Sequence, residues 1–293
     1  MNDKTIAFFT ALGSFLFWGA LVIYWHALKG VNPIEVVSHR AIWSLVFTGI
    51  LVIFLRKIPE VIKILKNPKY VLPLVVSSLL IAFNWALFIW SVANEKIVES
   101  SMGNYVTPLL NVAAAALIFK VKMNKLQILS VLLALIGVVY MIIIYGRIPY
   151  VALLFAVTFC AYGIIKKLVP ATVITGLFIE TLVISIPSAI YIIFLLSHNT
   201  SAIQNSDLFI KTMLILGGIV TTLPLLGFSF SAKILNLNTL GLLQYLTPTI
   251  AFLLGVFLYQ EYFSLNMLVT FIFIWSGLII YSFDGLYRLK KSK

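Results

Sequence analysis

Long apolar stretches make up most of this chain, and only short charged, glycine-containing or proline-containing breaks separate them. A helix needs ~20 mainly apolar residues to cross ~30 Å of hydrocarbon. Ten such helices use roughly 200 residues, which leaves room for short loops only. The pattern therefore predicts an all-α integral membrane protein with ten transmembrane helices. The expected spans are 5–25, 34–55, 71–93, 101–119, 126–145, 150–166, 173–196, 211–232, 239–258 and 265–287.

The composition excludes the other broad classes. The chain is 62% hydrophobic and 10% charged, whereas soluble domains average roughly 45–50% apolar and about 25% charged residues. Disordered chains are poor in apolar residues, so disorder is excluded too. The net charge of +12 is typical of nucleic-acid binders, but the 21 lysines and arginines are spread among apolar runs. We expect the lipid bilayer as the partner of this surface, and no nucleic acid.

The basic residues indicate how the chain is oriented. If the N-terminus is cytoplasmic, roughly 16 positive residues lie on that side and about 4 on the other, as the positive-inside rule requires. The sequence thus predicts a multi-pass protein of the bacterial inner membrane with both termini in the cytoplasm. The most basic segment, 56–70, has the pattern of a short amphipathic helix on the membrane surface.

Two halves of the sequence match each other. Asn104-Tyr105-Val106-Thr107-Pro108 corresponds to Gln244-Tyr245-Leu246-Thr247-Pro248, and the same offset of about 140 residues brings Gly137 onto Gly277. Five spans is an odd number, so a second copy enters the membrane from the opposite side. We predict two inverted five-helix repeats, 1–147 and 148–293. This layout is common in secondary transporters, which expose one central site alternately to either side.

Two charges, Arg40 and Glu180, lie well inside predicted spans. Arg40, preceded by His39, is about 6 residues into the second span, where a lipid-facing guanidinium costs at least ~2.5–3.5 kcal/mol. It either snorkels to the outer surface or faces a polar pathway, where it would bind an anionic substrate group or hold a carboxylate. Glu180 matches Arg40 at the repeat offset. A buried carboxyl can be carried neutral, so Glu180 is a candidate for proton coupling, with a structural or snorkelling acid as the alternative.

Several uncharged polar residues also lie in apolar surroundings. Amides there either join helices by hydrogen bonds or line a substrate pathway, and tyrosines can stack against a substrate. Prolines in the two matching motifs are expected to kink their helices and free backbone carbonyls for a cavity. The predicted pathway residues are His39, Arg40, Asn84, Asn104, Tyr105, Glu180, Gln244 and Tyr245, and the predicted kinks are at Pro108 and Pro248.

Enzyme signatures are missing from the sequence. The histidines His26, His39 and His198 are far apart, and no metal-ligand cluster accompanies them. The sequence has no nucleophile elbow and no Walker A loop. We therefore expect no metal, no cofactor, no enzymatic activity and no ATP-driven transport by this chain alone.

The sequence resembles the drug/metabolite transporter superfamily of EamA type, and within it the RarD-like permeases of bacteria. The resemblance implies a permease for metabolites or drug-like compounds, driven by an ion gradient such as protons or by metabolite exchange. One departure is Val121, between Lys120 and Lys122, where such proteins often have an acid; the second half keeps Glu261 there. The stretches that carry the resemblance are 38–44, 84–90, 218–226 and 240–249.

These features predict a secondary-active permease that moves a small polar metabolite or drug-like molecule by alternating access. The alternative from another class is a polytopic membrane scaffold or sensor that transports nothing. A continuous polar cavity related by the repeat would favour the transporter, and a fully packed apolar centre would favour the scaffold.

Overall fold

The computed structural model describes residues 3–118, 120, 122–145, 148–232, 234–235 and 243–291. Some sequence predictions fall outside this part: the acid position at Val121, the charges of Arg147 and Lys233, the repeat boundary at 147, and the start of the ninth predicted span at 239–242.

The described residues are mainly helical, and eight of the ten predicted spans have a helix of membrane-spanning length, whereas the sixth and ninth have shorter apolar helices. Eight helices are long and apolar enough to cross a membrane, while α7 and the α12–η1 segment are shorter apolar helices. The long helices are α1 (Asp3–Ala27), α2 (Pro33–Phe54), α4 (Pro68–Ala93), α5 (Ile97–Ile118), α6 (Lys125–Tyr145), α8 (Val173–Ser197), α10 (Leu208–Ala232) and α13 (Leu265–Lys291). The shorter ones are α7 (Tyr150–Leu168), α12 (Leu246–Leu253) and its π-helical continuation η1 (Leu254–Leu258).

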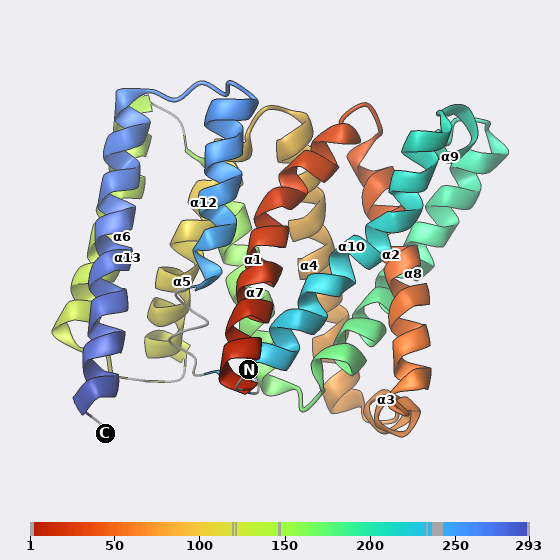
Figure 1. Ribbon diagram of the computed structural model, residues 1–293, viewed down its shortest axis with the longest axis horizontal. Helices are drawn as coiled ribbons and strands as arrows, with labels where there is room; N and C mark the ends of the chain where they lie inside the picture. The colour runs from red at the N-terminus through yellow and green to blue at the C-terminus, as the bar shows by residue number, and fades with distance from the viewer. Residues whose placement is uncertain are drawn as a thin grey trace.

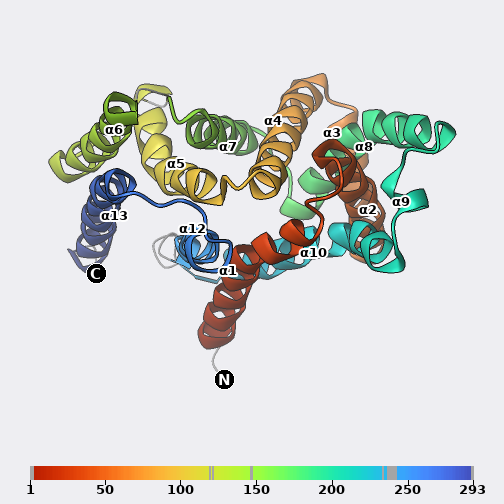
Figure 2. The same ribbon diagram turned by 90° about the horizontal axis from the view of Figure 1, so that it is seen from above.

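The helices form two facing rows (Figures 1 and 2). One row contains α6, α5, α7, α4 and α8, and the other contains α13, α12, α1, α10 and α2. The rows close at their ends, where α13 packs on α6 and α2 packs on α8. Each row therefore combines helices from both halves of the sequence, and neither half forms a separate bundle.

Two short helices lie between long ones at opposite ends of the molecule (Figure 1): α3 (Ile58–Leu65) and α9 (Ala202–Asn205). The amphipathic helix predicted within 56–70 is present as α3, which buries Val61 and Ile64 and leaves Lys63 exposed. Both chain ends lie towards the end of the molecule that carries α3.

Asparagine–proline pairs explain where two helices begin. The Asn32 side chain accepts a hydrogen bond from the Ile34 N–H, and the Asn67 side chain does the same for the Lys69 N–H. Each asparagine is followed by a proline in the first helical turn, where the missing N–H of proline costs no helical hydrogen bond. These two Asn-Pro pairs, which lie in breaks between apolar stretches, thus mark the starts of α2 and α4.

Carboxylates tie the short helices to long ones. Glu35 of α2 accepts hydrogen bonds from the Ser201 hydroxyl and the Ala202 N–H, both at 2.7 Å, at the start of α9. Glu60 of α3 accepts one from the Thr172 N–H at 2.7 Å, just before α8. Burial raises the pKa of Glu60, but the hydrogen bonds from Thr172 and Lys57 outweigh it and lower the pKa below its ordinary value.

The two motif prolines lie in different settings. Pro248 is the third residue of α12, which begins after a turn at Tyr245. It therefore lies in a first turn, where its missing N–H has no helical partner to lose, and a kink at Pro248 stays a prediction. Pro108 lies within α5, and a bend there stays a prediction.

A glycine permits close approach of α10 to α2. A Cβ added at Gly218 would collide with the backbone carbonyl of Trp43 and the backbone nitrogen of Ser44. Without water to drive helices together, membrane helices depend on such small residues for tight packing. Gly218 is therefore a packing residue of the α2–α10 contact.

Replacement of Gly218 by alanine is expected to destabilise the protein by about 1–3 kcal/mol, the usual cost of overpacking. The measurement is thermal unfolding of the purified protein in detergent. Gly13→Ala is the matched control, because a Cβ at Gly13 meets nothing within 4 Å, and it should be as stable as the original chain. Equal unfolding temperatures for Gly218→Ala and Gly13→Ala would contradict the packing role.

Candidate functional site

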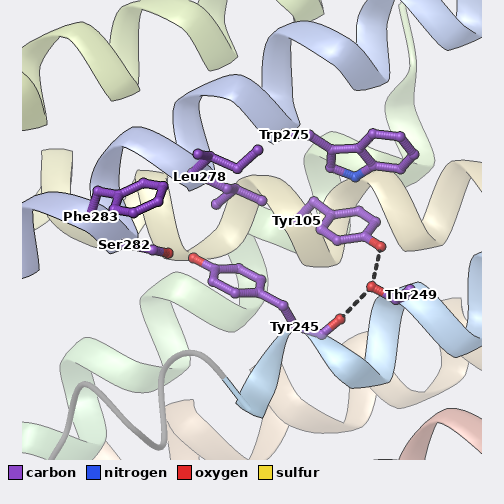
Figure 3. Close-up of a pocket in the computed structure, with 8 residues that line it drawn as sticks. Tyr105, Tyr245, Thr249, Trp275, Leu278, Ser282 and Phe283 are labelled. Atoms are coloured by element: carbon purple, nitrogen blue, oxygen red, sulfur yellow. Dashed lines mark hydrogen bonds between the residues drawn. The ribbon is translucent and has the colours of Figure 1, made fainter. Parts of the chain in front are cut away.

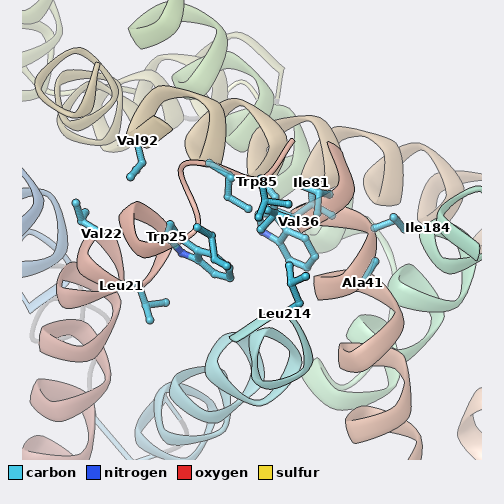
Figure 4. Packing of buried hydrophobic residues seen from close by; sticks show 14 of the residues in the cluster. Leu21, Val22, Trp25, Val36, Ala41, Ile81, Trp85, Val92, Ile184 and Leu214 are labelled. Carbon is cyan, nitrogen blue, oxygen red and sulfur yellow. The ribbon is translucent and has the colours of Figure 1, made fainter. Parts of the chain in front are cut away.

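Arg40 lies buried between two indole rings. Its side chain is on the third helical turn of α2, and the residue is 8% exposed. The guanidinium carbon lies 3.9 Å from the ring centroid of Trp85 on α4 and 5.0 Å from that of Trp25 on α1. Figure 4 shows these two indoles within the apolar cluster that joins α1, α2, α4 and α10. Arg40 therefore does not snorkel to an exposed position.

Among the described residues, Arg40 has no hydrogen-bond or ion-pair partner, and its Nε is wholly buried without one. Neighbouring His39 is buried as well, with its Nε2 3.8 Å from Glu35 and without a hydrogen-bond partner. One predicted role of Arg40 was to hold a carboxylate partner, and no carboxylate of the described residues pairs with it. Binding of an anionic substrate group stays open.

Glu180 is completely buried and is paired with Lys166. The Lys166 Nζ lies 3.0 Å from the carboxylate, and the hydroxyls of Ser77 and Tyr162 donate to it at 2.7 and 3.2 Å. The site thus joins α4, α7 and α8. The predicted span 150–166 ended at Lys166, whereas α7 extends to Leu168 and brings the Lys166 ammonium to Glu180. The position of Lys166 within one turn of the end of an apolar stretch was the sequence signal that could have indicated a pairing with a buried acid.

Asn84 connects two helices. Its side-chain N–H donates to the Phe155 carbonyl at 3.0 Å and to the Thr158 hydroxyl at 2.9 Å, both on α7. This is the helix-joining alternative for a buried amide. Of the other two predicted amides, Asn104 is half-buried and Gln244 is exposed.

The matching tyrosines of the two halves meet at one pocket, shown in Figure 3. The pocket has a volume of about 470 Å³ and lies between α5, α12 and α13. The Tyr105 hydroxyl is hydrogen-bonded to Thr249 at 2.7 Å, and the Tyr245 hydroxyl points towards Ser282. The walls are mainly aromatic and aliphatic, formed by Tyr105, Tyr245, Thr249, Trp275, Leu278, Ile279, Ser282 and Phe283.

The predicted pathway residues therefore occupy several places in the fold. The tyrosine pocket lies at the α13 end of the rows, whereas Arg40 and Glu180 lie towards the end closed by α2 and α8 (Figure 2). Sequence reasoning missed Trp25, Trp275 and Thr249 as site residues. The position of Thr249 directly after the matched motif could have identified it as a site residue. A tryptophan in an apolar run has no such sequence signal.

Within the described ranges, no group of three or more histidine, cysteine or acidic side chains could hold a metal ion. What the geometry offers instead is a buried cation held by aromatic rings, a buried ion pair, and an aromatic pocket with a few hydroxyls. These groups can bind a small molecule and hold charge inside a membrane.

Comparison with known proteins identifies the family. The EamA-like transporter family matches residues 5–143. An "Uncharacterized transporter" of Vibrio cholerae is 39% identical over 97% of this chain and 94% of its own length. The chain belongs to the EamA-like transporter family.

Other full-length relatives agree with this assignment. "Protein RarD" of Escherichia coli is 35% identical over 96% of this chain and 95% of its own length. "Uncharacterized transporter YojE" of Bacillus subtilis is 37% identical over 100% of this chain and 98% of its own length. A solved crystal structure with 17% identity covers 94% of this chain and 97% of its own, with a TM-score of 0.58, and supports the fold alone. The chain is thus a RarD-like, multi-pass membrane transporter and not an enzyme.

Removal of the Lys166 ammonium is expected to leave the Glu180 carboxylate buried without a counter-charge. Lys166→Ala should destabilise the protein by about 3–5 kcal/mol, measured by thermal unfolding in detergent. The double variant Lys166→Ala with Glu180→Gln should recover much of this loss, because the amide is neutral.

Lys57→Ala is the matched control for the Lys166 variant. It breaks the half-exposed pair with Glu60 at 3.2 Å, which should cost below about 1 kcal/mol. Equal losses for Lys57→Ala and Lys166→Ala, or no recovery in the double variant, would contradict the buried ion pair.

Proposed function

We propose that this EamA-family protein is a secondary-active transporter that moves a small polar metabolite or drug-like compound across the bacterial inner membrane by alternating access. Transport itself follows from the family. The alternating-access mechanism is supported by a reciprocal contact between α6 and α13, which is the expected signature of two inverted repeats, 1–147 and 148–293.

The reciprocal contact involves the two matched glycines. A Cβ at Gly137 would lie 3.0 Å from the Thr270 carbonyl oxygen, and a Cβ at Gly277 would lie 2.6 Å from the Ser130 carbonyl oxygen. Thr270 and Ser130 differ by the same offset of about 140 residues as the glycines. Gly137 of α6 thus faces Thr270 of α13, and Gly277 of α13 faces Ser130 of α6. This exchange of matched residues is the contact pattern that a two-fold axis produces.

The short helices support the same relation. Glu35 near the start of α2 binds α9, the short helix after α8. In return, Thr172 before α8 binds Glu60 of α3, the short helix after α2. Two halves that are related in this way can exchange their conformations, so that one site opens to each side of the membrane in turn.

The orientation we propose has both termini and α3 in the cytoplasm and α9 outside. The concentration of lysines and arginines around α3 supports it, because cytoplasmic loops carry the excess of positive charge. The anionic lipid of the inner leaflet is then the partner of this basic surface.

Cysteine labelling tests this orientation. Cys160 is the only cysteine of the chain, so Cys160→Ala provides a background for single cysteines at exposed positions on α3 (Lys63→Cys) and α9 (Gln204→Cys). In intact cells, a membrane-impermeant maleimide should label Gln204→Cys, and it should label Lys63→Cys only after permeabilisation. The reverse pattern would overturn the orientation.

Proton coupling is expected to depend on Glu180. In proteoliposomes with an imposed proton gradient, Glu180→Gln should abolish the response of uptake or export to the gradient, because an amide cannot take up the proton. A metabolite panel identifies the cargo first, and Lys63→Gln serves as the control. Unchanged coupling in Glu180→Gln would contradict the role of Glu180 in proton coupling. No response of the original chain to the gradient would leave metabolite exchange as the driving process, and no transport of any compound by the original chain would favour the scaffold or sensor.

A further inference from the structure

Arg40 carries a buried charge that no described group of this chain balances. The residue lies about 10 Å along α2 from the helix start, at a rise of 1.5 Å per residue, and it is 8% exposed. Buried charges in proteins are normally paired with an opposite charge, because a low-dielectric surrounding solvates an isolated ion poorly. The missing partner therefore needs an explanation.

The acids on the neighbouring helices are bound elsewhere. On α2 itself, Glu35 accepts hydrogen bonds from Ser201 and Ala202 at the start of α9. On α8, Glu180 is paired with Lys166 at 3.0 Å. Neither carboxylate is within ion-pair distance of Arg40.

The other helices around Arg40 contribute no negative charge from their described residues. From α1, the Tyr24 hydroxyl donates to the Met213 carbonyl of α10, and Trp25 offers its ring. From α4, Trp85 offers its ring. From α10, Gly217 lies next to the Arg40 backbone. The groups described around the guanidinium are thus two indoles, the phenol of Tyr24 and apolar side chains.

The indole rings interact with the guanidinium charge but accept no hydrogen bond in the plane of its N–H groups. A cation over an aromatic face is attracted by the ring, and the contacts at 3.9 and 5.0 Å hold the group between α1 and α4. The N–H bonds, however, point outward in the plane of the guanidinium, and the buried Nε has no partner. A planar fork of this kind is matched by the two oxygens of a carboxylate.

The charge balance restricts the ligand further. One guanidinium in an otherwise apolar cluster neutralises one negative charge. A dicarboxylate or a phosphate dianion would bring a second charge into the cluster without compensation. The buried apolar cluster that contains Trp25 and Trp85 favours an apolar body on the ligand; it also includes Leu21, Val22, Val36, Ile81 and Leu214.

We propose that Arg40 binds the carboxylate group of a small monoanionic organic substrate, with Trp25 and Trp85 holding the guanidinium in place. The proposal rests on the proposed transport function and names its substrate class. Because the carboxylate and the guanidinium neutralise each other, the pair can remain in the apolar cluster while α1, α2 and α4 rearrange around it.

A charge series of nearly identical molecules tests the proposal by binding, without the need for transport. The purified protein in detergent is titrated at constant ionic strength with benzoate, benzamide, benzamidine and phthalate, and with hexanoate as a flexible monocarboxylate. Trp25 and Trp85 are two of the six tryptophans that contribute to the intrinsic fluorescence of the chain, which gives one measure of binding, and thermal unfolding gives an independent measure. A saturable response and a raised unfolding temperature are expected with benzoate or hexanoate, and not with benzamide, benzamidine or phthalate.

Three variants connect the response to Arg40. Arg40→Gln should lose the response to monocarboxylates, while Lys63→Gln, which removes an exposed charge on α3, should retain it. Arg40→Lys keeps the charge but not the planar fork, and its affinity should fall about tenfold or more. If Arg40→Gln does not fold, the comparison of Arg40→Lys with Lys63→Gln still decides.

The proposal is overturned if the original chain responds to neither monocarboxylate, or if Arg40→Lys binds them as tightly as Lys63→Gln does. Uptake of the bound monocarboxylate into proteoliposomes is measured separately. Binding that depends on Arg40 without uptake would contradict the transport function and leave the anion site standing. Transport of neutral or cationic compounds alone, with no monocarboxylate binding, would contradict the anion site and leave the transport function standing.

Discussion

A polar group that leaves water in this protein costs free energy unless it finds a partner inside the fold, because hydrocarbon offers no hydrogen bonds. The chain has only nine acids, and four of them accept hydrogen bonds from backbone N–H groups at or beside the starts of other helices. Glu35 binds α9, Glu60 binds the residue before α8, Glu99 binds α7, and Glu261 binds the first two residues of α5. Free N–H groups and the positive end of the helix dipole favour a carboxylate there. The scarce negative charges thus connect helix ends across the bundle.

Between these ends, small residues determine how closely the helices pack. Gly218 permits the approach of α10 to α2, and Gly137 and Gly277 permit the approach of α6 and α13. These contacts lie at or near the two places where the rows of helices close. The helices are thus connected by carboxylates at their ends and by close backbone approach between them.

The candidate site shows where sequence reasoning succeeded and where it did not. The matched motif singled out Tyr105 and Tyr245, and the structure places both at one pocket; their part in a substrate pathway stays a prediction. Arg40 and Glu180 were recognised as charges inside spans, and the structure finds both buried. Their neighbours were not predictable. Lys166 reaches Glu180 from the last turn of α7, and Trp25 and Trp85 lie next to Arg40 because of how α1, α2 and α4 pack together.

The sequence by itself determined that the chain is a helical membrane protein and where its helices lie, since both follow from the length of apolar runs and from hydrogen bonds made within four residues. It also indicated the repeat, through short motifs at a constant offset. Only the tertiary structure decided which charges are paired. Glu180 has Lys166 while Arg40 has two indoles and no described carboxylate, because a side chain's partner depends on how helices from both halves pack, and local pattern does not contain that information.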